Sequence, residues 1–281
     1  MIKLFASDLD GTLLKGRNPD DPVYDIIERV LEQKKYFVIA TGRLMYPEHI
    51  KAIKFDKYPV YIICMNGALI RNPQKEIIFR KKINDPFLMN MFKEFPAVFF
   101  ELIGDKNIYL KQTREEFIEH VVSSELRRSK LPRDNLFLFL KNFLFECNEK
   151  DILNEGILKI NCHIDDPKEN WRFREFLESN KESVVNSPFE SNGIFELTDS
   201  TVNKGHSLGY LIDKLKINKD EVAVYGDGEN DLSMLRQFKN SYAPQNAIKE
   251  AKRSAKEVIE SCDAYGVPKH IHKILESQDT C

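Results

Sequence analysis

The stretch KLFASDLDGT, residues Lys3–Thr12, is the one around which the rest of the chain is organised. It predicts a short buried strand that ends at two carboxylates, Asp8 and Asp10, followed by Gly11. Alternation along an extended chain turns the side chains of Asp8 and Asp10 to the same side. Two carboxylates so close repel each other, so we expect a shared proton or a bound cation between them.

Two plainer interpretations compete with a functional one. Asp-Gly after an apolar run is typical of a hairpin turn, but residues 19–22 lead into a helical pattern instead of a second strand. A calcium-binding EF-hand loop that began at Asp8 would need Gly at its sixth position and Glu at its twelfth. Those positions hold Leu13 and Pro19, which excludes the EF-hand.

Composition narrows the function classes. The 281 residues carry a formal net charge of −2, which argues against a nucleic-acid binder that relies on bulk electrostatics. The chain contains no apolar run long enough to span a bilayer, and Asp8 and Asp10 interrupt the first apolar run too early for a signal peptide. Five scattered cysteines without a Cys-x-x-Cys pair favour reduced thiols and therefore a cytoplasmic protein. A monomer and a small homo-oligomer both stay open, because the sequence does not settle the oligomeric state.

The rhythm of the predicted elements divides the chain. Near-continuous apolar runs at residues 36–40 and 60–64 alternate with helical patterns, which predicts a parallel sheet covered on both faces. From about Lys82 the helices are interleaved with aromatic-rich strands, and the first rhythm returns near Gly193 with a strand-like segment at 195–198. We therefore expect an α/β fold with a doubly wound, mostly parallel, Rossmann-like sheet. Residues 1–82 and 193–281 would form this core, interrupted by an inserted α/β cap at 83–192.

Polar groups follow the predicted core strands where ligands of open parallel sheets bind, at the carboxyl ends. Convergence of several such groups on one edge is hard to explain by loop chemistry alone. The groups concerned are Asp8, Asp10, Thr41, Gly42, Asn66, Gly67 and Asp227.

Lys204 and the acidic segment 226–231 extend this pattern. Asn203 is a natural N-cap, so Lys204 lies in the first turn of a helix, where a cation opposes the helix dipole at a cost of about 0.3–1 kcal/mol. Lys204 is then either a solvated lysine or a ligand for a phosphate at the helix N-terminus. The segment 226–231 is either an acidic turn or the remainder of a Mg²⁺ site.

As a set, these motifs resemble those of the haloacid dehalogenase-like phosphatases. Asp8–Thr12 is similar to the first motif, Thr41–Arg43 to the second, and Lys204–Gly205 to the third, while Gly226–Asp227 with Asn230–Asp231 is similar to the fourth. The mixed α/β insertion between the second and third motifs resembles the Cof-type, sugar-phosphatase-like branch of the family. Gln245, where this branch often has glycine, departs from the pattern.

The resemblance implies a cytoplasmic phosphoric monoester hydrolase that acts on small phosphorylated metabolites, sugar phosphates or phosphorylated cofactors, with Mg²⁺ as cofactor. Asp8 would be the nucleophile and Asp10 the general acid and base. The resemblance implies the remaining roles as well. Mg²⁺ would be held by Asp8, the Asp10 carbonyl and Asp227, with Asp231 in a second layer around the metal. The phosphoryl group would be held by Leu9, Thr41, Gly42, Lys204 and Asn230.

Several alternatives stay open at this point. Arg43, Asn66 and Gly67 are candidate substrate contacts, although Arg43 would also suit a pairing with a core carboxylate and Asn66–Gly67 a structural turn. A phosphomutase of the same superfamily would use the same aspartate pair. A phospho-ligand sensor would bind without turnover, but it has no need of a nucleophile at Asp8.

Overall fold

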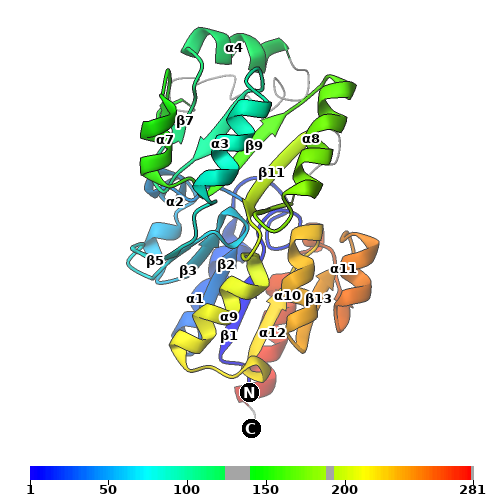
Figure 1. Ribbon diagram of the computed structural model, residues 1–281. Helices are drawn as coiled ribbons and strands as arrows, with labels where there is room; N and C mark the ends of the chain where they lie inside the picture. Colours follow the sequence, from blue (N-terminus) through cyan, green and yellow to red (C-terminus); the bar gives the residue numbers. More distant parts are fainter. Residues whose placement is uncertain (124–139, 188–192, 280–281) are drawn as a thin grey trace. The chain divides into compact units, whose positions relative to one another are not determined.

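The computed structural model describes residues 1–123, 140–187 and 193–279. The chain folds into two compact units (Figure 1). Unit 1 combines the two ends of the chain, Met1–Lys81 and Thr201–Cys281, and unit 2 is the intervening segment Lys82–Ser200.

Unit 1 is built on an eight-stranded sheet with the order β14-β13-β12-β1-β2-β3-β4-β5. Neighbouring strands from β14 to β3 are parallel, whereas β4 and β5 are antiparallel additions at one edge. The strands span β1 (Leu4–Ser7), β2 (Tyr36–Ala40), β3 (Tyr61–Cys64), β4 (Leu69–Arg71), β5 (Ile77–Arg80), β12 (Val222–Tyr225), β13 (Asn240–Pro244) and β14 (Glu257–Ile259).

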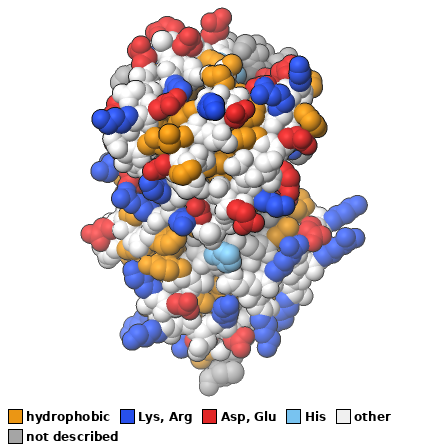
Figure 2. Space-filling model, in the orientation of Figure 1, with side chains coloured by type: hydrophobic (Ala, Val, Ile, Leu, Met, Phe, Trp, Pro, Cys, Tyr) orange, Lys and Arg blue, Asp and Glu red, His pale blue; other side chains and the backbone are white. Residues whose placement is uncertain are grey.

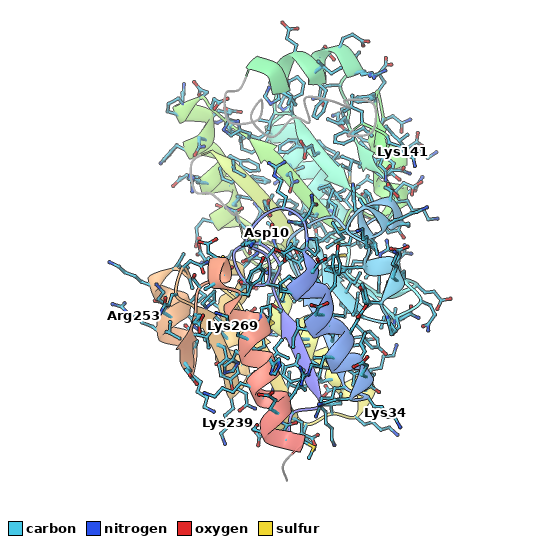
Figure 3. The ribbon with its side chains drawn as sticks, turned by 180° about the vertical axis from the view of Figure 1, so that it is seen from behind. Asp10, Lys34, Lys141, Lys239, Arg253 and Lys269 are labelled. Atoms are coloured by element: carbon cyan, nitrogen blue, oxygen red, sulfur yellow. The ribbon has the colours of Figure 1, made fainter. Side chains whose placement is uncertain are left out.

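Helices cover both faces of this sheet, as Figures 1 and 3 show from opposite sides. Helices α1 and α12 lie on one face and α9, α10 and α11 on the other. The helices span α1 (Asp21–Glu32), α2 (Pro47–Ala52), α9 (Lys204–Leu215), α10 (Leu232–Gln237), α11 (Lys249–Ser254) and α12 (Gly266–Asp279), with short 3-10 turns η1 (Phe55–Lys57), η2 (Met65–Gly67), η3 (Lys219–Glu221), η4 (Glu229–Asp231) and η5 (Cys262–Ala264).

The continuous apolar runs form the central strands because both faces of each strand are buried. All four residues of β1 are buried, and β1 pairs with β2 on one side and with β12 on the other. This pairing places the chain segments that follow β1 and β12 side by side, although Ser7 and Tyr225 are far apart in sequence. The expected α/β class with a doubly wound, mostly parallel sheet is confirmed.

Unit 2 has its own six-stranded sheet, ordered β10-β11-β9-β6-β7-β8, in which only β7 and β8 pair in parallel. One face of this sheet packs its apolar side chains, among them Phe100, Ile160 and Phe195, against helices. The elements span α3 (Asp85–Glu94), β6 (Phe100–Ile103), β7 (Ile108–Tyr109), α4 (Arg114–Ser123), β8 (Phe143–Leu144), α7 (Glu149–Glu155), β9 (Lys159–His163), α8 (Pro167–Ser179), β10 (Val184–Asn186) and β11 (Ile194–Asp199).

The chain returns from unit 2 to unit 1 later than the expected boundary at residue 193. The strand expected at 195–198 exists as β11, but it pairs with β9 and β10 of the second sheet, so unit 2 extends to Ser200. Phe195 and Leu197 point into the apolar core of unit 2, and that burial decides the sheet to which the strand belongs.

In the described residues, no helix is long and apolar enough to cross a membrane. On the face drawn in Figure 2, basic and acidic side chains are interspersed rather than collected into one basic area. This distribution fits the small net charge of the chain.

The core of unit 2 yields a stability prediction. Phe173 of α8 is fully buried, and its ring meets those of Phe95 and Phe195 edge-on at 5.0 and 4.9 Å. Phe173→Ala should lower the free energy of unfolding by about 3–5 kcal/mol, because it leaves a cavity among these rings. Urea unfolding would measure the loss, with Phe173→Leu as the control of smaller effect; equal stability of wild type and the alanine variant would contradict the assigned packing.

Candidate active site

Asp8 is the first residue after β1 and lies at the carboxyl-terminal edge of the unit 1 sheet. Its backbone N–H donates to the carbonyl oxygen of Tyr225 at 3.0 Å, which continues the pairing of β1 with β12 by one residue. The side chain is only 8% exposed. Asp8 is therefore held beside the loop that begins after Tyr225.

A buried lysine, Lys204, joins the loop after β1 to the loop after β12. The Nζ atom of Lys204, which is fully buried, donates to Oδ1 of Asp8 at 2.6 Å and to Oδ1 of Asp231 at 2.7 Å. Lys204 begins α9, and the side chain of the expected N-cap, Asn203, accepts a hydrogen bond from the N–H of His206 at 2.9 Å. Lys204 is thus an internal counter-ion of two carboxylates and not a solvated surface lysine.

Asp231 and Thr12 hold the acidic loop in shape. Oδ2 of Asp231 accepts hydrogen bonds from the backbone N–H groups of Asp227 and Gly228, both at 3.0 Å. Its Oδ1 accepts the hydrogen bond from Nζ of Lys204. The hydroxyl of Thr12 donates to Oδ1 of Asp227 at 2.6 Å. The role of Thr12 is not evident from the sequence, because its partner lies 215 residues away.

The backbone of Gly11 passes directly against Asp227. Gly11 has a φ of +77°, and a Cβ atom at this position would lie 2.5 Å from Oδ2 of Asp227, so no other residue fits without displacement. The carbonyl of Gly11 accepts a hydrogen bond from Nδ2 of Asn246 at 2.6 Å. Asn246 thereby anchors the loop after β1 and is a second residue that sequence reasoning missed.

The electrostatics of the cluster reflect a shortage of positive charge. Burial raises the pKa of Asp8 well above its usual value; Lys204 opposes this shift, and the charges of Asp231 and Asp227 add to it. Burial is also the main cause that raises the pKa of Asp227 to about 6. Burial alone would lower the pKa of Lys204, but the charges of Asp231 and Asp8 and its hydrogen bonds to both raise it instead.

The three carboxylates fit a divalent cation. Asp8, Asp227 and Asp231 each offer one oxygen within 4.8 Å of the others. When all three are ionised, Lys204 neutralises one charge and two negative charges remain uncompensated in a largely buried place. A hard cation that prefers oxygen ligands, such as Mg²⁺, matches this donor set and this charge.

Asp10 departs from the expected arrangement. Its carboxylate accepts hydrogen bonds from Nε of Arg43 at 2.7 Å and from Nη2 of Arg43. Strand β1 ends at Ser7, so strict alternation does not continue to Asp10. The repulsion between Asp8 and Asp10 is relieved by a separate cation for each carboxylate, Lys204 and Arg43, instead of one shared between them.

Figure 3 shows Asp10 at the end of unit 1 opposite to Lys34 and Lys239, which is the carboxyl-terminal edge of the parallel strands. Arg43 donates as well to the carbonyl of Arg17 at 2.9 Å, so it ties the segment after Gly11 to the loop after β2. The pairing that the sequence left open for Arg43 is therefore observed, with Asp10 as the carboxylate.

The other predicted residues gather at the same edge. Thr41 is buried, and its hydroxyl accepts a hydrogen bond from the N–H of Arg43 at 3.1 Å. Nδ2 of Asn230 donates to Oδ1 of Asn66 at 3.0 Å. Leu9 is buried, and its carbonyl accepts from the N–H groups of Thr12 and Leu14, which closes the turn after the strand. Gly42 and Gly67 lie in this group of loops, against Asn66 and Asn203 respectively.

Comparison with known sequences gives one family over nearly the whole chain. The pattern of the haloacid dehalogenase-like hydrolases matches residues 5–271. Phosphatase YwpJ of Bacillus subtilis is 28% identical over 298 residues, an alignment that covers 98% of this chain and 100% of the relative.

Solved structures share the fold. The protein TM0651 of Thermotoga maritima aligns with a TM-score of 0.79 and 24% identity, covering 97% of each chain. The subclass IIB sugar phosphatase BT4131 aligns with a TM-score of 0.73 and 21% identity, covering 97% of this chain and 98% of the other. At these identities the likeness concerns the fold alone.

The raised pKa of Asp227 predicts how cation binding depends on pH. At pH values below its pKa of about 6, the Asp227 carboxylate carries a proton, which competes with the cation. The proton on Asp227 should lower the affinity for Mg²⁺ by up to about tenfold per pH unit as the pH drops below about 6, and the raised pKa of Asp8 adds a further pH dependence.

The shift of the unfolding temperature caused by Mg²⁺, measured at several pH values, gives this affinity without any turnover. Asp227→Asn should weaken binding and remove this pH step, whereas Asp25→Asn, which changes an exposed aspartate of α1, should leave both unaltered. Binding of Mg²⁺ that is independent of pH in this range would contradict the role of Asp227.

Proposed function

We propose that this chain, which belongs to the haloacid dehalogenase-like hydrolases, is a magnesium-dependent phosphatase that releases phosphate from small phosphorylated metabolites through an aspartyl-phosphate intermediate. Membership of the family confirms the resemblance found in the motifs and the expectation of an enzyme, a hydrolase. Relatives named as phosphatases, such as YwpJ, support the phosphatase activity.

One observation carries the proposal: Lys204 is buried between Asp8 and Asp231, beside Asp227, where the central strands end. A lysine in this place fixes the orientation of the Asp8 carboxylate. It also supplies a positive charge for phosphoryl oxygens that approach Asp8. A sensor that only bound a phosphorylated ligand would gain nothing from a carboxylate there, because its charge repels phosphate.

In the first step, an oxygen of Asp8 attacks phosphorus, and the bond between phosphorus and the leaving oxygen breaks. Asp10 gives a proton to that oxygen, which leaves as a hydroxyl group. In the second step, Asp10 takes a proton from a water molecule whose oxygen attacks phosphorus. The bond to Asp8 then breaks and inorganic phosphate is released.

The ion pair with Arg43 bears on the role of Asp10. Both Nε and Nη2 of Arg43 donate to the Asp10 carboxylate and occupy its oxygens. For Asp10 to reach the leaving oxygen, its side chain therefore has to be released from Arg43 when substrate binds. Arg43 would act in the cycle as the resting partner of Asp10.

The remaining residues divide between phosphate and metal. The phosphoryl oxygens would be held by Thr41, the amides of Leu9 and Gly42, Asn230 and Lys204. Mg²⁺ would be held by Asp8, the Asp10 carbonyl and Asp227, with Asp231 orienting the loop behind them; when bound, it supplies positive charge to the transferring phosphoryl group. A phosphomutase would use the same groups, and release of free phosphate distinguishes the two activities.

We assign the choice of leaving group to the inserted unit 2, because the residues of the candidate active site address only phosphate and metal. One face of its sheet is polar: Nζ of Lys159 donates to Glu196 at 2.6 Å, and Nδ2 of Asn161 donates to Glu101 at 3.3 Å. Oδ1 of Asn161 and the hydroxyl of Thr198 are buried without a hydrogen-bond partner among the described residues. Unsatisfied groups of this kind are costly to keep unless a ligand uses them.

We place the activity in the cytoplasm on the cysteine pattern. Within the described residues, none of the four cysteines, Cys64, Cys147, Cys162 and Cys262, forms a disulfide. Reduced thiols are usual in that compartment. The substrates proposed here, small phosphorylated metabolites, are also those that a reducing cell interior supplies.

The test of the function is phosphate release from a panel of sugar phosphates, nucleotides and phosphorylated cofactors, with Mg²⁺ and with chelator. Asp8→Asn should lower kcat by about 10⁴-fold or more, because an amide is a poor nucleophile. Its circular dichroism and unfolding temperature report whether the fold is kept, and Asp25→Asn is the matched surface control. Turnover near the wild-type level in Asp8→Asn, or full activity in chelator, would refute the mechanism.

The role of unit 2 predicts a separation of activity from stability. Thr198→Val replaces the unpartnered hydroxyl with a methyl group of similar shape, so the unfolding temperature should stay equal or rise. Its kcat/KM should fall on the best metabolite of the panel and stay unchanged on a small aryl phosphate, while Thr198→Ser restores the metabolite value. Equal losses on both substrates would mean that Thr198 supports the fold or the chemistry instead of selection.

A further inference from the structure

A turn with unusual backbone geometry follows β3. Met65, Asn66 and Gly67 have φ values of 52°, 55° and 110°, so three successive residues lie outside the right-handed region. A run of this kind is costly for side chains other than glycine and occurs where the surroundings determine it. The contacts of residues 65–67 with the rest of unit 1 therefore have to account for this conformation.

The turn is joined to the loop that carries Thr41 and Gly42. The N–H of Asn66 donates to the carbonyl of Thr41, and the N–H of Met65 donates to the carbonyl of Arg43, both at 3.2 Å. The side chain of Asn66 lies against Gly42 so closely that a Cβ atom there would be 2.8 Å from Oδ1 of Asn66. Asn66 thus sets the position of the Gly42 backbone, including the amide assigned to phosphate.

The same side chain holds Asn230. Oδ1 of Asn66 accepts the hydrogen bond from Nδ2 of Asn230 at 3.0 Å, across 164 residues of sequence. Asn66 is 3% exposed, so this bond is shielded from solvent, whereas Asn230 is only partly buried. One amide oxygen therefore lies next to two groups assigned to the phosphoryl oxygens.

The next residue extends the connection to α9. The carbonyl of Gly67 accepts a hydrogen bond from the hydroxyl of Ser207 at 2.7 Å. A Cβ atom on Gly67 would lie 2.6 Å from the carbonyl oxygen of Asn203, the N-cap residue that precedes Lys204. The turn consequently contacts three of the segments that would bind phosphate, residues 41–43, Asn230 and the start of α9, while the fourth, the loop that carries Leu9, follows β1.

The left-handed backbone alone does not decide between asparagine and glycine at this place. Glycine adopts that conformation at no steric cost, and asparagine adopts it more readily than other side chains do. Nδ2 of Asn66 is buried and has no hydrogen-bond partner among the described residues, so the amide brings an unsatisfied donor into the interior. The advantage that remains is the oxygen, which holds Asn230 and borders Gly42.

We propose that Asn66 is a positioning residue of the phosphoryl site, which acts through Asn230 and the Gly42 backbone and not by contact with the leaving group. This inference rests on the proposed phosphatase function. It makes the turn after β3 the part that sets the spacing of the phosphate-binding groups.

The test is a double-mutant cycle. Asn66→Gly removes the amide and suits the left-handed backbone, so the fold is kept; it should lower kcat/KM by about 10- to 100-fold, as is usual when the partner of a ligand-binding group is lost. In the Asn66→Gly/Asn230→Ala double variant, the loss of activity should be smaller than the product of the two single losses, because Asn66 has already lost one of the two groups through which it acts.

Ser207→Ala is the matched control, since it breaks a different bond of the same turn, the one to Gly67. Its effect should add to that of Asn230→Ala instead of disappearing. The unfolding temperatures of all variants are measured alongside, and a shared loss of stability does not produce this pattern. Additive effects of Asn66→Gly and Asn230→Ala, or wild-type kcat/KM in Asn66→Gly, would overturn the proposal.

The same cycle is run on binding of inorganic phosphate in the presence of Mg²⁺, measured by calorimetry, which requires no turnover. If the wild type releases or binds phosphate and the cycle is additive, only the role of Asn66 fails. If the wild type neither binds phosphate nor releases it from any member of the panel, the proposed function fails and the role of Asn66 with it.

Discussion

The buried ammonium group of Lys204 is the constraint on which the rest of the site depends. Removing a lysine charge from water costs several kcal/mol, and only close, hydrogen-bonded carboxylates offset that cost. The two that do so, Asp8 and Asp231, lie 196 and 27 residues away in sequence. The pairing of β1 with β12 and the position of α9 have to bring two separate loops, those of Asp8 and Asp231, within one hydrogen bond of the Lys204 nitrogen. The strand order of unit 1 is what makes this possible.

Lys204 compensates the negative charge of the site only in part, and the proposed function depends on the charge that remains. Two charges of Asp8, Asp227 and Asp231 remain without a partner when all three are ionised, which is why burial and mutual repulsion raise the pKa of Asp8 and Asp227. A buried cluster of this kind is poor evidence for stability, since apolar residues of equal volume would fold as well or better. It is better explained as a place that a divalent cation and a phosphoryl group complete together.

The sequence was informative where a single local property decides the structure. Strands buried on both faces are continuous apolar runs, so β1, β2, β3 and β12 could be predicted. In β11, apolar and polar residues alternate, which indicates a strand but not the sheet it joins; its burial against the helices of unit 2 decided that. The ion pair of Asp10 with Arg43 stayed one of several alternatives, because β1 ends at Ser7 and strand alternation no longer fixes where the Asp10 side chain lies. The contributions of Thr12 and Asn246 could not be predicted, because their partners lie 215 and 235 residues away.

The glycines of the site show how the backbone itself is part of the arrangement. Gly11, Gly42 and Gly67 each lie where a Cβ atom would come within 2.5 to 2.8 Å of a side-chain or backbone oxygen. These approaches let the loop after β1 rest on Asp227 and the loop after β2 rest on Asn66. Donors that are held in place before a charged substrate arrives do not have to be reoriented during the reaction, and that saving is greatest in a site shielded from water. In the proposed phosphatase, the close contacts at glycine and the hydrogen bonds of Asn66, Thr12 and Asp231 would therefore serve one purpose, to hold the phosphate-binding backbone in place before the substrate binds.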